Sequence, residues 1–208
     1  MRKQIIGESE LDRRTFFDSC AQSWDLDETP EKLNKLRDIF SNLSLYFDGN
    51  ILDVGCGTGI LVPILRNLSS NQNPILELDI SRAMLQKNKT RWSPRFSRIH
   101  HLNGNAMYLP LSEGSISLVI CFAVIPHISD KYKALNEFYR VLTTEGVLLI
   151  LHLMSSEKLN ELHASVGEAV ANDRLPSADV MAQKVRETGF SLIKKEEKDD
   201  LYLIIGKK

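Results

Sequence analysis

One nine-residue stretch constrains the fold of this chain more than any other feature. It reads Ile51-Leu52-Asp53-Val54-Gly55-Cys56-Gly57-Thr58-Gly59 and places three glycines two residues apart, directly after a short apolar run. The apolar run suits a strand that is covered on both faces. Glycine has no Cβ, so the backbone of the turn can approach a ligand closely. Such a strand and turn are typical of α/β proteins that bind a ligand at the carboxyl ends of their strands.

The glycine spacing distinguishes two classes of ligand. Turns that bind dinucleotides read G-x-G-x-x-G and place a pyrophosphate at the N-terminus of the following helix. Here the spacing is G-x-G-x-G, and Asp53 lies two positions before Gly55. A carboxylate repels a pyrophosphate and attracts a cationic group, such as the amino group of a methionine moiety. The spacing therefore disfavours NAD, and an ordinary tight turn is the alternative at this point.

Apolar patterning predicts alternating strands and helices around this turn. Five apolar runs predict strands over residues 51–54, 74–80, 98–102, 116–122 and 147–151. Helical spacing predicts helices over residues 11–24, 30–47, 59–68, 155–173 and 177–188, and two more that start at the capping residues Ser81 and Asp130. Two final strands, 189–195 and 201–205, are joined by a short turn, so they must pair antiparallel.

Composition and charge exclude several classes of protein. The 208 residues include 26 Lys and Arg against 27 Asp and Glu, and the net charge of −1 gives no basic field for nucleic acid. Three scattered cysteines are too few for a disulfide framework, so we expect a reducing, cytoplasmic setting. The N-terminal residues lack the apolar core of a signal peptide, and no apolar run is long enough to span a bilayer. The oligomeric state stays open.

Several segments, in order along the chain, resemble one family. The turn at residues 51–59 resembles motif I of the class I S-adenosylmethionine-dependent methyltransferases, and Leu78–Leu85 resembles their second motif. Arg140–Gly146 resembles the R-V-L-x-P-G-G turn of the same family. The resemblance covers roughly residues 45–151. The segment Phe16–Asp25 is similar to the matching part of the quinone-biosynthesis C-methyltransferase branch and its small-molecule relatives.

The resemblance implies a particular α/β fold. This is a Rossmann-like, doubly wound, mostly parallel seven-stranded sheet with a C-terminal antiparallel hairpin and helices on both faces. We expect a single methyltransferase domain with an N-terminal helical cap over residues 1–48, a cofactor-binding core over 49–152, and cap helices with the terminal hairpin over 153–208. Phe17 and Trp24 are expected in the part of the cap that closes the acceptor pocket, together with an insertion that follows the fifth strand.

The resemblance also implies S-adenosylmethionine as the cofactor. Asp79 ends the second predicted strand, where a carboxylate can accept hydrogen bonds from both ribose hydroxyls. The implied cofactor contacts are Asp53, Gly55, Cys56, Gly57, Gly59, Asp79, Ile80, Met84, Asn105, Ala106 and Phe122. Asn105 and Ser117 each replace an Asp that is common in the family. An amide can still accept from the adenine amino group, so we expect altered contacts at Asn105 rather than lost binding.

His127 is the candidate catalytic residue. It follows the fourth predicted strand, in a segment that lacks the Asn/Asp-Pro-Pro-Tyr/Phe pattern of enzymes that methylate exocyclic or amide nitrogens. Together with the net charge, this favours a small-molecule acceptor over nucleic acid. A neutral imidazole suits proton removal near neutral pH, and a structural, helix-capping histidine is the alternative. A further alternative is a metal site formed by His127, His152, His163 and Asp173. These residues lack the close spacing in the sequence that is typical of metal ligands.

Two functions of different kinds fit these patterns. The first is methyl transfer to a small molecule, which the glycine spacing, Asp53 and Asp79 favour. The second is a cofactor-binding regulatory or partner module without turnover, which the departures at Asn105 and Ser117 keep open. A dehydrogenase is a distant third, because the glycine spacing is wrong for a dinucleotide.

Overall fold

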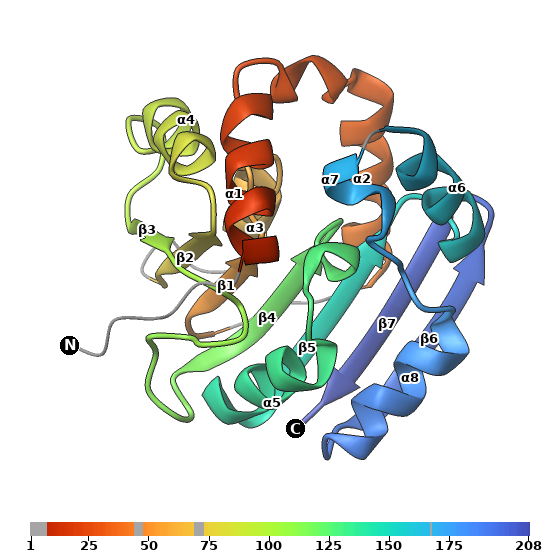
Figure 1. Ribbon diagram of the computed structural model, residues 1–208. Coiled ribbons are helices and arrows are strands. Elements are labelled where there is room, and N and C mark those ends of the chain that lie inside the picture. Colours follow the sequence, from red (N-terminus) through yellow and green to blue (C-terminus); the bar gives the residue numbers. More distant parts are fainter. Residues whose placement is uncertain (1–7, 44–47, 69–72, 167) are drawn as a thin grey trace.

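A seven-stranded sheet forms the centre of the molecule (Figure 1). The computed structural model describes residues 8–43, 48–68, 73–166 and 168–208. The strands, in the spatial order β3-β2-β1-β4-β5-β7-β6, are β1 (Ile51–Val54), β2 (Ile75–Asp79), β3 (Ile99–Asn103), β4 (Ile116–Phe122), β5 (Leu142–His152), β6 (Ser191–Lys198) and β7 (Leu201–Lys207). Neighbours among β1 to β5 pair parallel, whereas β7 pairs antiparallel with both β5 and β6. This is the predicted mostly parallel sheet with a C-terminal hairpin.

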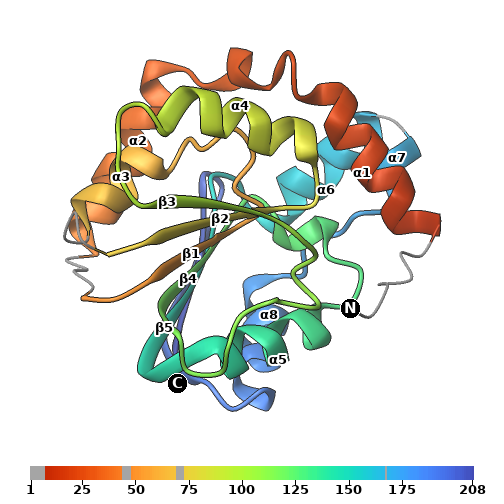
Figure 2. The same ribbon diagram turned by 90° about the vertical axis from the view of Figure 1, so that its left-hand side faces the viewer.

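Helices cover both faces of the sheet (Figure 2). They are α1 (Glu8–Cys20), α2 (Pro30–Asn42), α3 (Val62–Asn67), α4 (Arg82–Trp92), α5 (Lys131–Val141), α6 (Ser156–Val166), α7 (Glu168–Ala171) and α8 (Ala178–Glu187), with 3-10 turns at Trp24–Asp27 and Ile125–His127. The helices α2, α3 and α4 lie on one face, and α5 and α8 lie on the other (Figure 2). Within the described ranges, no helix combines the length and the apolar character needed to cross a bilayer.

The side chains of the strands alternate between two apolar cores, as the period of a strand requires. Leu52 belongs to the core that contains Phe138 of α5 and Met181 of α8. Ile51, its neighbour on β1, belongs to the opposite core with Leu65 of α3. All four residues of β1 are buried, which confirms a strand covered on both faces.

The strand predictions agree well with the structure. The predicted strands over 51–54 and 116–122 coincide with β1 and β4. The strand predicted over 147–151 is longer, because β5 begins at Leu142, directly after α5, and continues to His152. The first part of β5 does not show the regular apolar pattern from which the strand was predicted. Its pairing with β4 is also irregular near the start of β4.

Several predicted helices end at different residues. The helix predicted over 11–24 ends at Cys20, where the chain turns and the N–H of Ser23 donates to the Cys20 carbonyl (3.1 Å). Within the helix predicted over 155–173, the structure describes α6 and α7 on the two sides of residue 167, which lies outside the described residues. Part of the helix predicted over 30–47 lies outside the described residues, since α2 ends at Asn42 and 44–47 are not described.

Two predicted helix caps are confirmed, and they fix the turns that follow β2 and β4. The Ser81 hydroxyl accepts from the N–H of Met84 (3.1 Å) at the start of α4. The Asp130 carboxylate accepts from the N–H of Lys133 (3.0 Å) at the start of α5. Each cap satisfies backbone donors that the first turn of a helix leaves free. The chain therefore leaves the carboxyl ends of β2 and β4 along defined paths.

Candidate functional site

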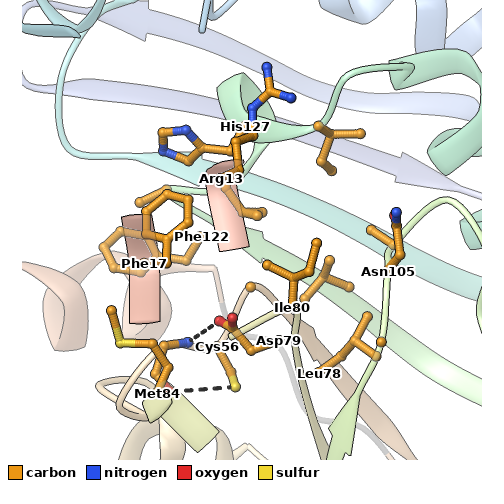
Figure 3. Close-up of a pocket in the computed structure, with 18 of the residues that line it drawn as sticks. Arg13, Phe17, Cys56, Leu78, Asp79, Ile80, Met84, Asn105, Phe122 and His127 are labelled. Atoms are coloured by element: carbon orange, nitrogen blue, oxygen red, sulfur yellow. Dashed lines mark hydrogen bonds between the residues drawn. The ribbon is translucent and has the colours of Figure 1, made fainter. Parts of the chain in front are cut away.

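A pocket opens at the carboxyl ends of β1, β2 and β4 and is covered by α1 and the turn at Trp24–Asp27 (Figure 3). Figure 3 shows Cys56 and Met84 at one end of it and Arg13 and His127 at the other. We call these the turn end and the cap end of the pocket. Phe17 and Phe122 lie between the two ends, and Asp79 lies beside Cys56 at the turn end.

The glycine turn shapes the turn end. Gly55 has a φ of +69°, and a Cβ on it would lie 2.3 Å from the side chain of Val124. Gly57 has a φ of +54° and lines the pocket beside Trp24. The N–H groups of Gly55 and Cys56 both donate to the carbonyl of Leu78 (2.8 and 3.1 Å). The end of β2 thus fixes the turn through hydrogen bonds. The positive φ values favour glycine at positions 55 and 57.

Asp79 joins this turn to the pocket. Its two carboxylate oxygens accept from the N–H of Gly57 (2.9 Å) and the N–H of Ser81 (2.7 Å). Burial raises the pKa of Asp79 to about 6, although these backbone hydrogen bonds oppose the rise. Each oxygen of a carboxylate can accept more than one hydrogen bond. Asp79 is therefore held in place by the backbone and can still accept from two hydroxyl groups of a ligand.

Two more carboxyl groups, Asp53 and Glu77, are buried behind the turn. They are 2% and 0% exposed and lie opposite each other on β1 and β2. Burial, then the charges of Glu77 and Asp79, raise the pKa of Asp53 well above its ordinary range. Burial likewise raises the pKa of Glu77 to about 7, although Asn88 donates to it (2.7 Å). The turn end therefore favours cations.

The wall beside β3 is mainly apolar. Leu78, Met84 and Ala106 line it, and Asn105 lies at its edge (Figure 3). The Asn105 side-chain oxygen accepts from the N–H of Met107 (2.9 Å), which fixes the turn after β3.

Ser117, the second position at which the chain lacks an Asp that is common in the family, lies far from the pocket. Ser117 is next to the amino end of β4, and its N–H donates to the carbonyl of Asn50, just before β1 (2.8 Å). A Cβ on Gly49 would lie only 2.0 Å from the Ser117 hydroxyl oxygen. Because the pocket is at the carboxyl ends of the strands, Ser117 does not line it.

The cap end brings together residues that are far apart in the sequence. Asp173 is 2% exposed, and Arg13 from α1 donates to its carboxylate through Nη2 (2.6 Å) and Nε (3.0 Å). His127 contacts the same carboxylate through Nδ1 (2.7 Å). The imidazole of His127 lies between the rings of Phe17 and His163, with centroids 5.0 and 5.1 Å away.

The electrostatic surroundings keep His127 neutral near neutral pH. Burial lowers its pKa below the ordinary value, although Asp173 opposes the change. Burial alone would raise the pKa of Asp173, but the hydrogen bonds from His127 and Arg13 outweigh it and hold that pKa below its ordinary range. His152 lies behind the pocket at the end of β5, and burial lowers its pKa to about 3.

The histidines that were considered as metal ligands gather only in part. His127 and His163 both contact Asp173, the latter through the backbone carbonyl (3.0 Å), and a guanidinium is bound to the same carboxylate. Among the described residues, no group of three or more His, Cys, Asp or Glu side chains is arranged to hold a metal ion. At the cap end, Arg13 and Asp173 form an ion pair, and the neutral imidazole of His127 is hydrogen-bonded to Asp173.

All of the predicted cofactor residues except Asp53 and Gly59 line the pocket, and so does His127. A Cβ on Gly59 would lie 2.7 Å from side-chain atoms of Asn88 and Trp92, so this glycine permits α4 to pack closely. Direct cofactor contacts of Asp53 and Gly59 stay predictions. Sequence reasoning missed Arg13, which lines the cap end and has no sequence signal that links it to Asp173, 160 residues away.

The comparisons with known proteins agree with this geometry. Residues 52–150 match a family model described as a methyltransferase domain. The ubiquinone/menaquinone biosynthesis C-methyltransferase of Vibrio parahaemolyticus is 29% identical over 148 residues, which cover 65% of this chain and 57% of that protein. The enzyme of the same name from Campylobacter jejuni is 31% identical over 122 residues, which cover 56% of this chain and 50% of that protein. The matches thus span little more than half the length of these relatives.

A solved structure shares the fold. The crystal structure of a SAM-dependent methyltransferase from Aquifex aeolicus superposes with a TM-score of 0.74 at 16% identity, covering 91% of this chain and 97% of that one. At this identity the likeness shows the fold alone.

Proposed function

We propose that this chain is a class I S-adenosylmethionine-dependent methyltransferase that transfers the methyl group of S-adenosylmethionine to a small-molecule acceptor. One observation carries the proposal. A single pocket has a turn end with the carboxylate of Asp79 and a cap end with the neutral imidazole of His127. Donor and acceptor can thus be held side by side in it, which is the main requirement of the reaction.

The turn end fits the cofactor. The glycine turn exposes backbone rather than side chains, and Asp79 is fixed with lone pairs to spare for two ribose hydroxyls. The apolar wall of Leu78, Met84 and Ala106 suits an adenine ring. Asp53 and Glu77 are buried behind the turn with raised pKa values, so a cationic group bound at the turn end, such as the amino group of a methionine moiety, would favour their ionised forms.

The cap end would carry the acceptor side of the reaction. When bound, S-adenosylmethionine supplies a methyl group on a positively charged sulfur, and the carbon–sulfur bond breaks with its electron pair left on the sulfur. Phe17, Phe122 and Val124 line the middle of the pocket and exclude water from it. As the acceptor atom bonds to the methyl carbon, His127 takes the proton that this atom loses.

The rest of the chain supports a small acceptor. The net charge of −1 provides no basic surface for nucleic acid. The relatives are named for methylation of a carbon in quinone biosynthesis, and the acceptor of this chain is one that fits beneath α1. We propose that the N-terminal helices around Phe17 and Trp24 and the segment Ser155–Asp173 close the acceptor pocket over a cofactor-binding core of residues 49–152. A reducing, cytoplasmic setting stays a prediction from cysteine usage.

Calorimetry tests the choice of cofactor. We expect S-adenosylmethionine and S-adenosylhomocysteine to bind the purified protein and NAD not to bind. Tighter binding of NAD would overturn the proposed function, because the glycine turn and Asp79 would then have been assigned to the wrong ligand.

A methyl-transfer screen tests turnover. The protein is mixed with S-adenosylmethionine and fractionated metabolite extracts, and formation of S-adenosylhomocysteine is measured in each fraction. Turnover in a fraction identifies the acceptor. Tight cofactor binding without turnover in any fraction would instead favour a regulatory or partner module.

A further inference from the structure

We propose that Asp173 is a positioning residue that holds His127 in the tautomer with a proton on Nδ1, and that Arg13 couples this arrangement to the position of α1. The inference rests on the proposed function, in which His127 takes a proton from the acceptor. It adds the residues that make this possible and restricts the class of acceptor.

The tautomer follows from the chemistry of Asp173. Its pKa lies below the ordinary range, because the hydrogen bonds from His127 and Arg13 outweigh the effect of burial, so the group is a carboxylate and can only accept hydrogen bonds. Nδ1 of His127 lies 2.7 Å from it and must therefore carry the proton. In a neutral imidazole the lone pair then belongs to Nε2.

The ring of His127 is also held in orientation. Phe17 lies edge-on to it, with the ring planes at 73°, and His163 also packs against it, with the ring planes at 38°. His163 is fixed in turn, because its Nδ1 donates to the backbone carbonyl of Asp173 (3.0 Å). The residue that accepts from His127 thus also fixes the residue that packs against it.

Arg13 provides the charge that makes a buried Asp173 tolerable. A buried carboxylate is costly without a cation, and the guanidinium donates to both of its oxygens (3.0 and 3.3 Å from Nε). Arg13 belongs to α1, which also packs against α4 and α7. Movement of α1 away from the pocket would break this ion pair, so the charge that Asp173 presents to His127 depends on the position of α1.

This arrangement restricts the acceptor. A neutral imidazole with its lone pair on Nε2 is useful only if the acceptor atom loses a proton, as a thiol, a phenol, an amine or an acidic C–H group does. A carboxylate acceptor needs no base. We therefore assign the acceptor to the protic class.

Nuclear magnetic resonance tests the proposal without knowledge of the acceptor. Long-range ¹H–¹⁵N spectra of the full chain with S-adenosylhomocysteine report the tautomer and the pKa of each histidine. The charged or titratable groups that act on His127 are Arg13, Asp173, His163 and His152, and Lys131 acts on Asp173 and Arg13. In the natural protein we expect His127 as the neutral tautomer with the proton on Nδ1.

Two variants should shift the pKa of His127 in opposite directions. Asp173→Asn removes the carboxylate, so the pKa should fall and the Nδ1-protonated tautomer should lose its preference. Arg13→Gln removes the cation and keeps the carboxylate, so the pKa should rise. The matched control is Asp179→Asn. Asp179 lies on α8 and forms an exposed ion pair with Lys195 of β6, so this variant should change neither the tautomer nor the pKa of His127.

The outcomes separate the proposal from its premise. An unchanged tautomer and pKa in Asp173→Asn, or shifts in the same direction in both variants, would overturn the positioning role. If Asp173→Asn does not fold, Arg13→Gln decides: a rise supports the proposal, and no change or a fall overturns it. Failure of the natural protein to bind S-adenosylmethionine or S-adenosylhomocysteine in calorimetry would instead overturn the proposed function.

Discussion

The two ends of the pocket are built in different ways. The turn end comes from one continuous part of the chain, in which β1, β2 and the turns after them hold each other through backbone hydrogen bonds. The cap end is assembled from α1, the turn after β4 and the segment after α7, and its central contact joins Arg13 to Asp173. The turn end carries buried acids, whereas the cap end carries a compensated ion pair, aromatic rings and histidines.

The residues of the turn end are needed for the fold, whereas the residues of the cap end are available for binding the acceptor. The turn end depends on the sheet, so its geometry changes little unless β1 or β2 changes. The cap end depends on side chains at the surface of the core, and these can be replaced without affecting the sheet. Cofactor choice and acceptor choice are therefore carried by separate sets of residues.

The substitution His127→Ala should give the largest effect and should act only at the cap end. Loss of a general base lowers turnover by roughly 10²–10⁴-fold. Cofactor affinity should be nearly unchanged, because His127 lies at the opposite end of the pocket from Asp79 (Figure 3). The measurements are kcat with the acceptor from the screen and calorimetry with S-adenosylmethionine. His100→Ala, at an exposed position on β3, is the control. Wild-type turnover in His127→Ala would show that this histidine is structural.

The substitution Glu77→Gln should change how stability depends on pH. Burial raises the pKa of Glu77 from an ordinary value of 4.5 to about 7. Between these values the folded chain keeps a proton that the unfolded chain releases, so the wild type loses stability as pH rises through this window. The Gln variant should gain about 2–3 kcal/mol relative to the wild type between about pH 5 and about pH 8.

Denaturant unfolding at both pH values measures this difference. Titrating groups that do not interact with Glu77 cancel in the comparison because both proteins contain them, whereas the pKa of Asp53 should fall when the charge of Glu77 is removed. Glu113→Gln, at an exposed position, is the control and should follow the wild type. If the two proteins differ in stability by the same amount at both pH values, then Glu77 does not keep its proton in the folded chain over this window.

The substitution Asp79→Ala should weaken cofactor binding at the turn end without touching the cap end. Hydrogen bonds to a charged group contribute roughly 1.5–3 kcal/mol, so the affinity for S-adenosylmethionine should fall by at least about tenfold. Asp79→Asn keeps one acceptor oxygen and should lose less. Because Asp79 also accepts from Gly57 and Ser81, circular dichroism must confirm that both variants are folded. An unchanged Kd in folded Asp79→Ala would refute the ribose contact.

The turn end could be predicted from the sequence because its contacts are local. The glycine spacing, the strand of residues 51–54 and Asp79 at the end of the next strand all lie within about thirty residues of one another. Parallel strands must place their carboxyl ends at one edge of a sheet, so Asp79 could be expected beside the glycine turn. The arrangement of the strands was implied by the resemblance to the methyltransferase family.

The cap end could not be predicted because its contacts are distant in sequence. Arg13 and Asp173 are 160 residues apart, and neither belongs to a motif. Asp18 shows the same limit, since it accepts from the Ser81 hydroxyl (2.6 Å) and so secures α1 to the start of α4. The sequence indicated His127 and the cap helices, but the carboxylate that joins them was considered only as a metal ligand.

The last prediction concerns the motion of the cap and has the smallest effect. Amides of α1 (Glu8–Cys20) should exchange with solvent more slowly when S-adenosylhomocysteine is bound, because opening of the cap exposes Phe17 and breaks the ion pair of Arg13. At a ligand concentration of about ten times Kd, coupling of closure to binding slows exchange by about tenfold. Hydrogen exchange with mass spectrometry measures this, and α8, which does not line the pocket, is the internal reference. The substitution Arg13→Gln should speed exchange in α1 in the absence of ligand and leave α8 unchanged. Equal exchange of α1 with and without ligand would contradict a closing cap, and the two ends of the pocket would then be equally rigid.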